Sequence, residues 1–274
     1  MAAQRERPQR SDLGARVLAA IPAIAFAIFI IAEGGWVFAI GALALGVLAL
    51  GELSAMFSRV RPPMLAGMLA VAAMVLAAQQ YGHTKQVLMA LVGSFPLAFF
   101  LALARPRREN VSWALAVTYL SVLWVGLPLV YAVLLRKLPH GNGLIIDVLV
   151  GTFFGDTAAY FGGRGWGRTP LAPRISPNKT LEGAVAGFIG GTLAFWFAGL
   201  YQNWLSGRDA IVIGAFVALA APIGDLFESL VKRDLGVKDT GRFFGAHGGV
   251  LDRLDAVLFT IVAGYFAAVG LGYT

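Results

Sequence analysis

The chain has 274 residues, of which 58% are hydrophobic and only 14% charged, and it contains no cysteine. Soluble domains carry about 25% charged residues, so this composition excludes an ordinary soluble domain and indicates many membrane spans. The lack of cysteine excludes disulfides and thiolate metal sites. The formal charge of +7 does not indicate nucleic-acid binding, because the basic residues lie between apolar runs and form no single patch.

Nine apolar runs follow one another along the chain, each close to the ~20 residues that a membrane helix needs. They cover residues 15–33, 35–54, 63–80, 86–104, 112–135, 143–162, 181–201, 209–230 and 250–272. A basic N-terminus precedes the first run, as in a signal peptide. No clear cleavage site follows this run, so we interpret the run as the first membrane helix. The expected fold class is an all-α, polytopic integral membrane protein with about nine helices.

Basic residues predict the orientation of these spans. With a cytoplasmic N-terminus and nine alternating spans, 18 of the 22 Lys and Arg residues fall in cytoplasmic segments. Membrane proteins concentrate positive charge on that side. The count therefore predicts an N-terminus in the cytoplasm and a C-terminus outside, and it places segments 163–180 and 231–249 on the cytoplasmic side.

One membrane domain is expected over residues 1–274. Residues 1–140 carry little chemistry and are expected to form a scaffold, whereas residues 141–274 carry the polar motifs. Glu33 and Glu52 lie at the ends of predicted spans, where a carboxylate can reach the lipid headgroups. We interpret both glutamates in that way.

The first polar motif of residues 141–274 begins inside the sixth span. Asp156 lies there, where a carboxylate without a task is costly, and a Gly-rich basic loop follows. The sequence SPNKTLEG over residues 176–183 then opens the seventh span. Helix N-termini attract anions, and Lys179 and Thr180 are placed to add donors. The alternative is that Ser176 or Thr180 only caps the helix.

The most charged stretch runs from Asp225 to Asp255 and holds six of the 15 acidic and five of the 22 basic residues. Four polar residues with i, i+3, i+4, i+7 spacing share one face of the eighth span: Asp225, Glu228, Ser229 and Lys232. Asp252 and Asp255 share a face of the ninth span in the same way. These two carboxylate-bearing faces flank a basic loop that contains glycines.

Carboxylates of this kind suit a hard cation such as Mg²⁺. Four basic residues of the same stretch suit phosphate oxygens: Lys232, Arg233, Lys238 and Arg253. Glycines around His247 allow the backbone to approach a phosphate closely. Together these features are typical of phosphoryl or nucleotidyl transfer. The alternative is a helix hairpin held together by internal salt bridges.

The charged stretch resembles a family signature. The matching positions are Ser229-Leu-Val-Lys232-Arg233, then Lys238-Asp239, then Gly245-Ala-His247-Gly248-Gly249-Val-Leu-Asp252-Arg253-Leu-Asp255. This pattern is similar to that of the phosphatidate cytidylyltransferase (CDP-diglyceride synthase) family, as are GDLFES before it and SPNKTLEG upstream. The motifs span residues 156–255. One departure is Gly245-Ala246-His247, where many members have Pro-Gly-His.

The resemblance implies a nucleotidyltransferase of phospholipid biosynthesis that converts CTP and phosphatidic acid into CDP-diacylglycerol and pyrophosphate. The implied catalytic residues are Asp225, Lys232, Arg233, Lys238, Asp239, His247, Asp252, Arg253 and Asp255. Substrate binding is implied for Asp156, Ser176, Asn178, Lys179, Thr180, Glu182, Ser229, Gly248 and Gly249. Asp225 and Asp252 are the best candidate metal ligands, followed by Glu228 and Asp255, with Asp156 as a further outer candidate.

Mg²⁺ is the implied cofactor, and a second cation is left open. The expected location is the inner (plasma) membrane of a bacterial-type cell, with the active site facing the cytoplasm. A homodimer is compatible with the resemblance.

Three other classes of protein are considered. A secondary transporter or channel also has Gly-interrupted spans and intramembrane carboxylates, but its charges lie near the midplane and not at one face. A CTP-dependent lipid kinase of the polyprenol or phytol type would lack the full run of the signature. A catalytically inactive interaction protein would not need the complete charged set.

Overall fold

The computed structural model describes residues 13–104, 109–241 and 248–274, with side chains described from residue 21 onward. Within these ranges eight helices are long and apolar enough to cross a membrane, which confirms an all-α polytopic membrane protein. The helices are α1 (Leu13–Glu33), α2 (Gly35–Met56), α3 (Met64–Tyr81), α4 (Thr84–Leu103), α5 (Val111–Ser121), η1 (Val122–Gly126), α6 (Leu127–Lys137), α7 (Gly141–Trp166), α8 (Leu181–Gly199), α9 (Gly207–Asp234) and α10 (Leu251–Gly270). Each of the nine predicted runs corresponds to a helix, and the first of them is α1, whose described apolar part begins at Ile21.

The predicted fifth span is one continuous rod made of α5, η1 and α6, with a total length of 27 residues. Its middle is the π-helical turn η1. Pro128 lies two residues after this turn, and because proline has no N–H, one regular helical hydrogen bond is missing here. Single π-turns inside longer helices are frequent at functional sites.

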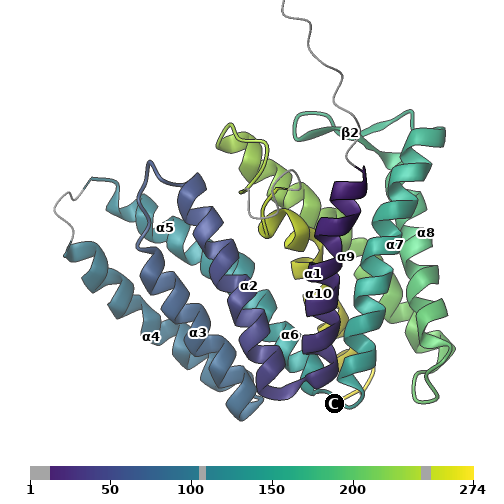
Figure 1. The fold of residues 1–274 in the computed structure, drawn as a ribbon, viewed down its shortest axis with the longest axis horizontal. Coiled ribbons are helices and arrows are strands. Elements are labelled where there is room, and N and C mark those ends of the chain that lie inside the picture. The colour runs from purple at the N-terminus through teal and green to yellow at the C-terminus, as the bar shows by residue number, and fades with distance from the viewer. Residues whose placement is uncertain (1–12, 105–108, 242–247) are drawn as a thin grey trace, which may run out of the picture.

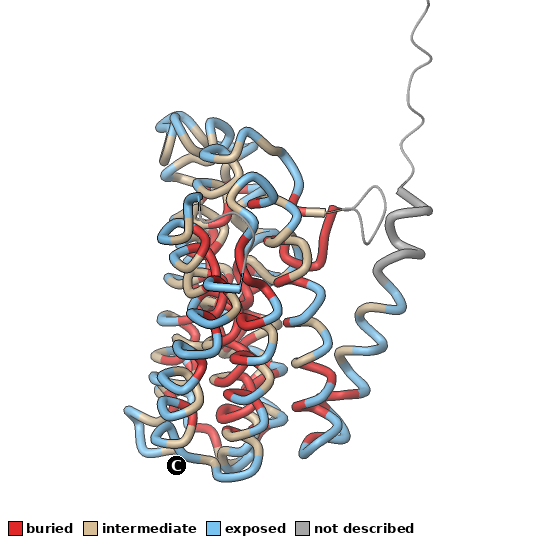
Figure 2. Tube along the Cα trace, turned by 90° about the vertical axis from the view of Figure 1, so that its left-hand side faces the viewer, coloured by how far each residue is buried: buried red, intermediate tan, exposed pale blue. Residues whose placement is uncertain are grey.

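The helices form two groups joined by α6 and α10. In Figure 1 helices α2 to α5 lie on one side and α7, α8 and α9 on the other. The core between α2, α3 and α6 contains fully buried side chains such as Leu50, Val71 and Leu135. Figure 2 shows exposed residues along the outer helix faces, and many of these are large and apolar, including Phe154, Phe197 and Phe216. An apolar outer surface of this kind is what a lipid-facing bundle requires.

Helices α7 and α8 pack against each other through glycines spaced four residues apart. A Cβ atom on Gly155 would lie 3.3 Å from the carbonyl oxygen of Gly187, and one on Gly191 would lie 2.9 Å from that of Gly151. Small residues at this spacing let membrane helices approach closely. This packing fixes α7, which carries Asp156, against α8, which follows the SPNKTLEG motif.

The segment between α7 and α8 differs from the predicted loop. Helix α7 continues to Trp166, so several glycines expected in the loop are helical. The remainder contains a hairpin of two antiparallel strands, β1 (Pro170–Ala172) and β2 (Ser176–Thr180), with Ala172 opposite Ser176. We call the end of the bundle that carries this hairpin the hairpin end; the C-terminus lies at the opposite end (Figure 1).

At the opposite end two basic side chains complete the ends of other helices. Arg136 Nε donates to the carbonyl oxygen of Ile31 at 3.0 Å, and Lys137 Nζ donates to that of Gln79 at 2.6 Å. The last carbonyl groups of a helix have no partner within it, and cations stabilise them. These two residues therefore tie α6 to α1 and α3.

Candidate active site at the hairpin end

The site begins where α9 and α10 approach each other most closely. A Cβ atom on Gly224 would lie 2.5 Å from the carbonyl oxygen of Asp255 and 3.1 Å from the Cα of Ala256. Only glycine allows this contact. Asp225, which follows Gly224, lies within electrostatic range of Asp255 on α10.

Asp156 on α7 lies within electrostatic range of both Asp255 and Asp225. Three carboxyl groups from three helices, and from both predicted motifs, are therefore at the same end of the bundle. Asp156 is exposed, and the side chain of Asp225 is 36% exposed. The cluster is therefore accessible to a ligand.

The hairpin reaches this cluster through Lys179, which forms an ion pair with Asp225. Arg233 Nε also donates to the carbonyl oxygen of Ile175 at 3.2 Å, so the end of α9 holds the hairpin in place. These contacts bring the segment 156–183 together with the stretch Asp225–Asp255.

Two residues of the SPNKTLEG motif shape the backbone around Lys179. Thr180 is the N-cap of α8, and its hydroxyl accepts a hydrogen bond from Gly183 N at 3.1 Å. The Glu182 carboxylate accepts from the backbone N–H groups of Arg168 and Thr169 and from the Thr169 hydroxyl at 2.9 Å. In the structure Thr180 therefore caps α8, and Glu182 ties the segment after α7 to the start of α8. Neither bond tests the predicted substrate contacts of these two residues.

Lys232 and Asp252 organise the second half of the site. Lys232 Nζ lies 2.9 Å from Glu228 Oε2 and 3.0 Å from Asp252 Oδ1. Asp252 in turn accepts from the Gly249 N–H at 2.7 Å, and from the Thr240 N–H and hydroxyl, each at 3.0 Å. Both oxygens of Asp252 are thus engaged with donors of the loop between α9 and α10.

Glu52 has a structural role that its interpretation as a headgroup-facing carboxylate missed. Its carboxylate does not face the headgroups; it accepts from the N–H groups of Val250 at 2.8 Å and Leu251 at 3.0 Å, and from the Thr240 hydroxyl at 3.2 Å. An anion at the N-terminus of α10 is favourable because the first N–H groups of a helix have no partner within it. No local pattern reveals this contact, because 198 residues separate Glu52 from Val250.

Two glycines of the signature, Gly248 and Gly249, make room for these carboxylates. Gly248 has a φ of +80°, a left-handed conformation that favours glycine, and a Cβ atom there would meet Asp252. A Cβ atom on Gly249 would meet Glu52. The sequence interpretation attributed both glycines to close contact with a phosphate; in the structure they are close to two side chains.

The other predicted site residues lie around this centre. Ser229 Oγ is 3.4 Å from Asp225 Oδ1, and Ser176 is half-buried on β2. Exposed positions are occupied by Asn178, Arg233, Lys238, Asp239 and Arg253. His247 lies outside the described residues.

The donor groups of the site suit a cation. The ion pairs and electrostatic interactions link five carboxyl groups with the ammonium groups of Lys179 and Lys232; the carboxyl groups are those of Asp156, Asp225, Glu228, Asp252 and Asp255. Carboxyl oxygens are the donors that Mg²⁺ prefers. Among the described residues, however, no three acidic or histidine side chains converge as a ready-made metal site. The donor chemistry fits Mg²⁺, provided that a ligand supplies the remaining oxygens.

A family model described as "Cytidylyltransferase family" matches residues 14–269, which is nearly the whole chain. The signature at the hairpin end lies inside this match.

Individual relatives agree with this model. A phosphatidate cytidylyltransferase of Staphylococcus epidermidis is 32% identical over 256 residues, or 90% of this chain and 95% of the relative. The match to the phosphatidate cytidylyltransferase of Thermotoga maritima is shorter: the two chains are 41% identical over 47% of this chain and 50% of the relative. In Mycobacterium leprae the match is 37% identical over 60% of this chain and 53% of the relative. The chain thus spans about half the length of these last two relatives.

Proposed function

The chain belongs to the cytidylyltransferase family, and we propose that it is a phosphatidate cytidylyltransferase, converting CTP and phosphatidic acid into CDP-diacylglycerol and pyrophosphate. The observation that carries the proposal is the ion pair between Lys179 and Asp225, which joins a basic hairpin to a carboxylate cluster at one end of a lipid-exposed bundle. The site thereby combines basic side chains that can bind phosphates with carboxylates that can bind a metal ion, and a membrane lipid can reach both.

In this reaction a phosphate oxygen of phosphatidic acid attacks the α-phosphorus of CTP. The new P–O bond forms while the bond to the β-phosphate oxygen breaks, and the electron pair leaves with pyrophosphate. The nucleophile is already an anion, so no strong general base is required. The main demand is to position the two substrates and to offset their charge.

Lys179 and Lys232 are the residues proposed to offset this charge. Lys179 is 25% exposed and Lys232 17% exposed, and both ammonium groups are held in the site by carboxylates. Each would exchange a carboxylate partner for a phosphate oxygen when the substrates bind. Arg233, Lys238 and Arg253 surround them and are proposed to contact the outer phosphates.

Mg²⁺ is the proposed cofactor, and it would neutralise phosphate charge. Asp225 and Asp255, with Asp156, are the residues proposed to hold it. Glu228 and Asp252 are less suitable than the sequence suggests, because Lys232 and the loop donors engage them. Mg²⁺ commonly uses one or two carboxylates together with substrate phosphates, in agreement with the absence of a ready-made site among the described residues.

The proposed location is the plasma membrane, with the hairpin end facing the cytoplasm. CTP is supplied there from water, whereas phosphatidic acid stays in the bilayer. The distribution of Lys and Arg between the two ends supports this orientation. A homodimer stays a prediction.

Purified protein with radiolabelled CTP, phosphatidic acid and Mg²⁺ is expected to yield labelled CDP-diacylglycerol and pyrophosphate. Chelation by EDTA is expected to stop the reaction and excess Mg²⁺ to restore it. Diacylglycerol as the lipid acceptor serves as the discriminating control. Phosphorylation of diacylglycerol, or no product from phosphatidic acid under varied lipid and metal conditions, would contradict the proposal.

A further inference from the structure

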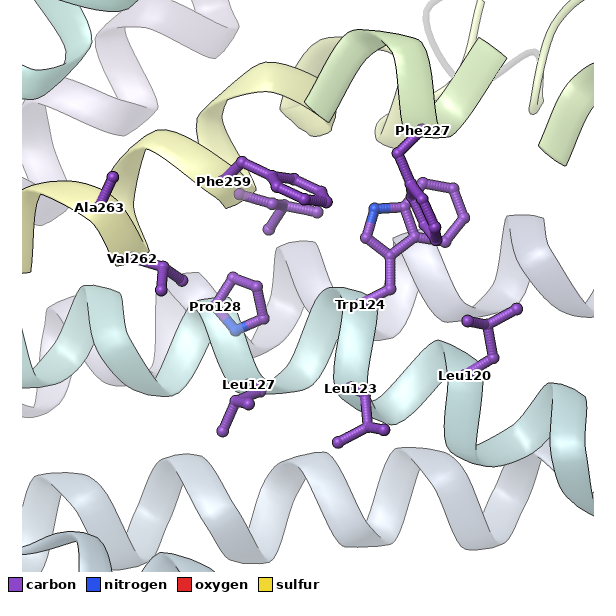
Figure 3. A pocket seen from close by; sticks show the side chains of 10 residues that line it. Leu120, Leu123, Trp124, Leu127, Pro128, Phe227, Phe259, Val262 and Ala263 are labelled. Atoms are coloured by element: carbon purple, nitrogen blue, oxygen red, sulfur yellow. The ribbon is translucent and has the colours of Figure 1, made fainter. Parts of the chain in front are cut away.

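An apolar groove of about 430 Å³ lies between the α5–η1–α6 rod and the helices α9 and α10. Its walls include Leu123 and Leu127 on the rod, Phe227 on α9, and Phe259 and Ala263 on α10 (Figure 3). This volume is within the roughly 300–1,000 Å³ of small-molecule sites. The groove is large enough for part of an apolar ligand.

One polar group in this apolar wall has no partner. The indole Nε1–H of Trp124 is buried and makes no hydrogen bond to any residue that the structure describes. Trp124 is only 5% exposed, and its ring packs edge-on against Phe227, with centroids 4.8 Å apart. Figure 3 shows its nitrogen on the side of the ring that faces Phe259, another residue of the groove wall. A buried donor without an acceptor costs about 1–3 kcal/mol, so it is a place where a ligand carbonyl would be stabilised.

Trp124 is also the centre of the π-helical turn, which runs from Val122 to Gly126. A π-turn displaces the side chains on one side of a helix relative to a regular α-helix, and such turns are frequent at functional sites. The turn and the unpartnered indole N–H are separate observations, and they occur at the same residue.

Two residues of the groove wall are close in sequence to carboxylates of the cluster. Phe227 precedes Glu228 directly, and Phe259 follows Asp255 by one helical turn. Ala263 lies one turn further along α10, away from the hairpin end. A lipid whose phosphate is at the cluster would therefore extend its chain along the groove, parallel to the helices.

We propose that this groove binds one acyl chain of the lipid substrate, and that Trp124 Nε1–H donates a hydrogen bond to the ester carbonyl oxygen of that chain. This proposal rests on the proposed function, because it takes the lipid to be phosphatidic acid. A peptide segment is a poorer occupant, since it would bring several backbone polar groups into a wall with one donor. A diacyl lipid has an ester carbonyl that is followed by a hydrocarbon chain. The carbonyl can accept from the Trp124 N–H, and the hydrocarbon chain can pack against the apolar wall.

The test compares ester-linked phosphatidic acid with its ether-linked analogue, which lacks both carbonyl groups. Trp124→Phe retains an aromatic ring but removes the donor. We expect it to raise KM for the ester lipid roughly three- to ten-fold, as loss of one hydrogen bond predicts, with little change in kcat. With the ether lipid, wild type and Trp124→Phe are expected to have equal KM. An equal rise in KM for both lipids, or no rise for the ester lipid, would overturn the hydrogen bond.

A second variant tests the groove itself. Ala263→Phe places a large side chain in the groove and is expected to raise KM for both lipids at least roughly ten-fold, with KM for CTP unchanged. The matched control is Ala73→Phe at an exposed position of α3, which should leave both KM values unchanged. Equal effects of the two substitutions on lipid KM would overturn the groove assignment, as would no effect of Ala263→Phe.

Gel filtration and circular dichroism in detergent identify any variant that fails to fold. In that case Ala263→Leu, a smaller filling substitution, takes its place. Wild-type turnover is measured first with both lipids. Absence of CDP-diacylglycerol from the wild type rejects the proposed function, whereas an active wild type with unaffected Trp124→Phe and Ala263→Phe variants rejects only the groove.

Discussion

The carboxylate of Glu52 occupies the space in which a side chain at Gly249 would have to lie. The same carboxylate accepts hydrogen bonds from the first N–H groups of α10, and its Oε1 lies 2.6 Å from where a Cβ of Gly241 would be. A glutamate of α2 thus contacts the loop between α9 and α10 at two places, at Thr240–Gly241 and at Gly249–Val250.

Gly249→Ala is expected to displace Glu52 and to lower activity at least about ten-fold, because the added methyl group and the carboxylate cannot share one position. The matched control is Gly51→Ala, where a Cβ atom would have nothing within 4 Å and activity should be retained. In a double-mutant cycle, Glu52→Ala combined with Gly249→Ala should destabilise the protein less than the sum of the two single changes. Strict additivity of the melting temperatures would show that the two residues do not interact.

Glu52→Gln is expected to destabilise the protein by about 1–3 kcal/mol. A glutamine offers one acceptor oxygen, and its NH₂ group would face a backbone N–H of α10. Thermal unfolding in detergent measures this loss. Glu33→Gln, at an exposed carboxylate on α1, is the control and should leave the melting temperature unchanged. If both substitutions had the same small effect, the hydrogen bonds of Glu52 would contribute nothing to stability.

Asp225→Asn and Asp252→Asn are expected to inactivate the enzyme for different reasons. Asp225 pairs with Lys179 and faces the site, so its loss should reduce turnover by about 10²–10³ with the melting temperature retained. Asp252 holds Thr240 and Gly249, so its loss should also lower the melting temperature. Near-normal turnover of Asp225→Asn would contradict the placement of the reaction at this cluster.

The predicted orientation can be tested with cysteine labelling, because the chain contains no cysteine. Lys238→Cys, at an exposed position of the α9–α10 loop, should react with a membrane-impermeant maleimide only from the cytoplasmic side. Arg208→Cys, exposed at the start of α9, should react only from the outside. The reverse pattern would show that the hairpin end faces away from the cytoplasm.

Much of the site follows from spacing within single helices. The i, i+3, i+4 and i+7 positions of Asp225, Glu228, Ser229 and Lys232 place them on one face because an α-helix has 3.6 residues per turn. The structure confirms the contact of Lys232 with Glu228. The backbone conformation between α7 and α8 was harder to predict from the sequence. Glycines 162 and 163 continue α7, since packing against Ala186 and Gly183 of α8 compensates for their low helix propensity.

The sequence by itself determined the class of the protein, its helices and the two motifs, since these depend on local hydropathy, on spacing and on a contiguous signature. Only the tertiary structure decided which distant groups meet. It joined Lys179 to Asp225, brought Asp156 within electrostatic range of Asp255, and placed Glu52 of α2 against Gly249. The physical reason is that such contacts depend on how closely whole helices pack, and no periodicity within one helix records which carboxylate will reach a neighbour 198 residues away.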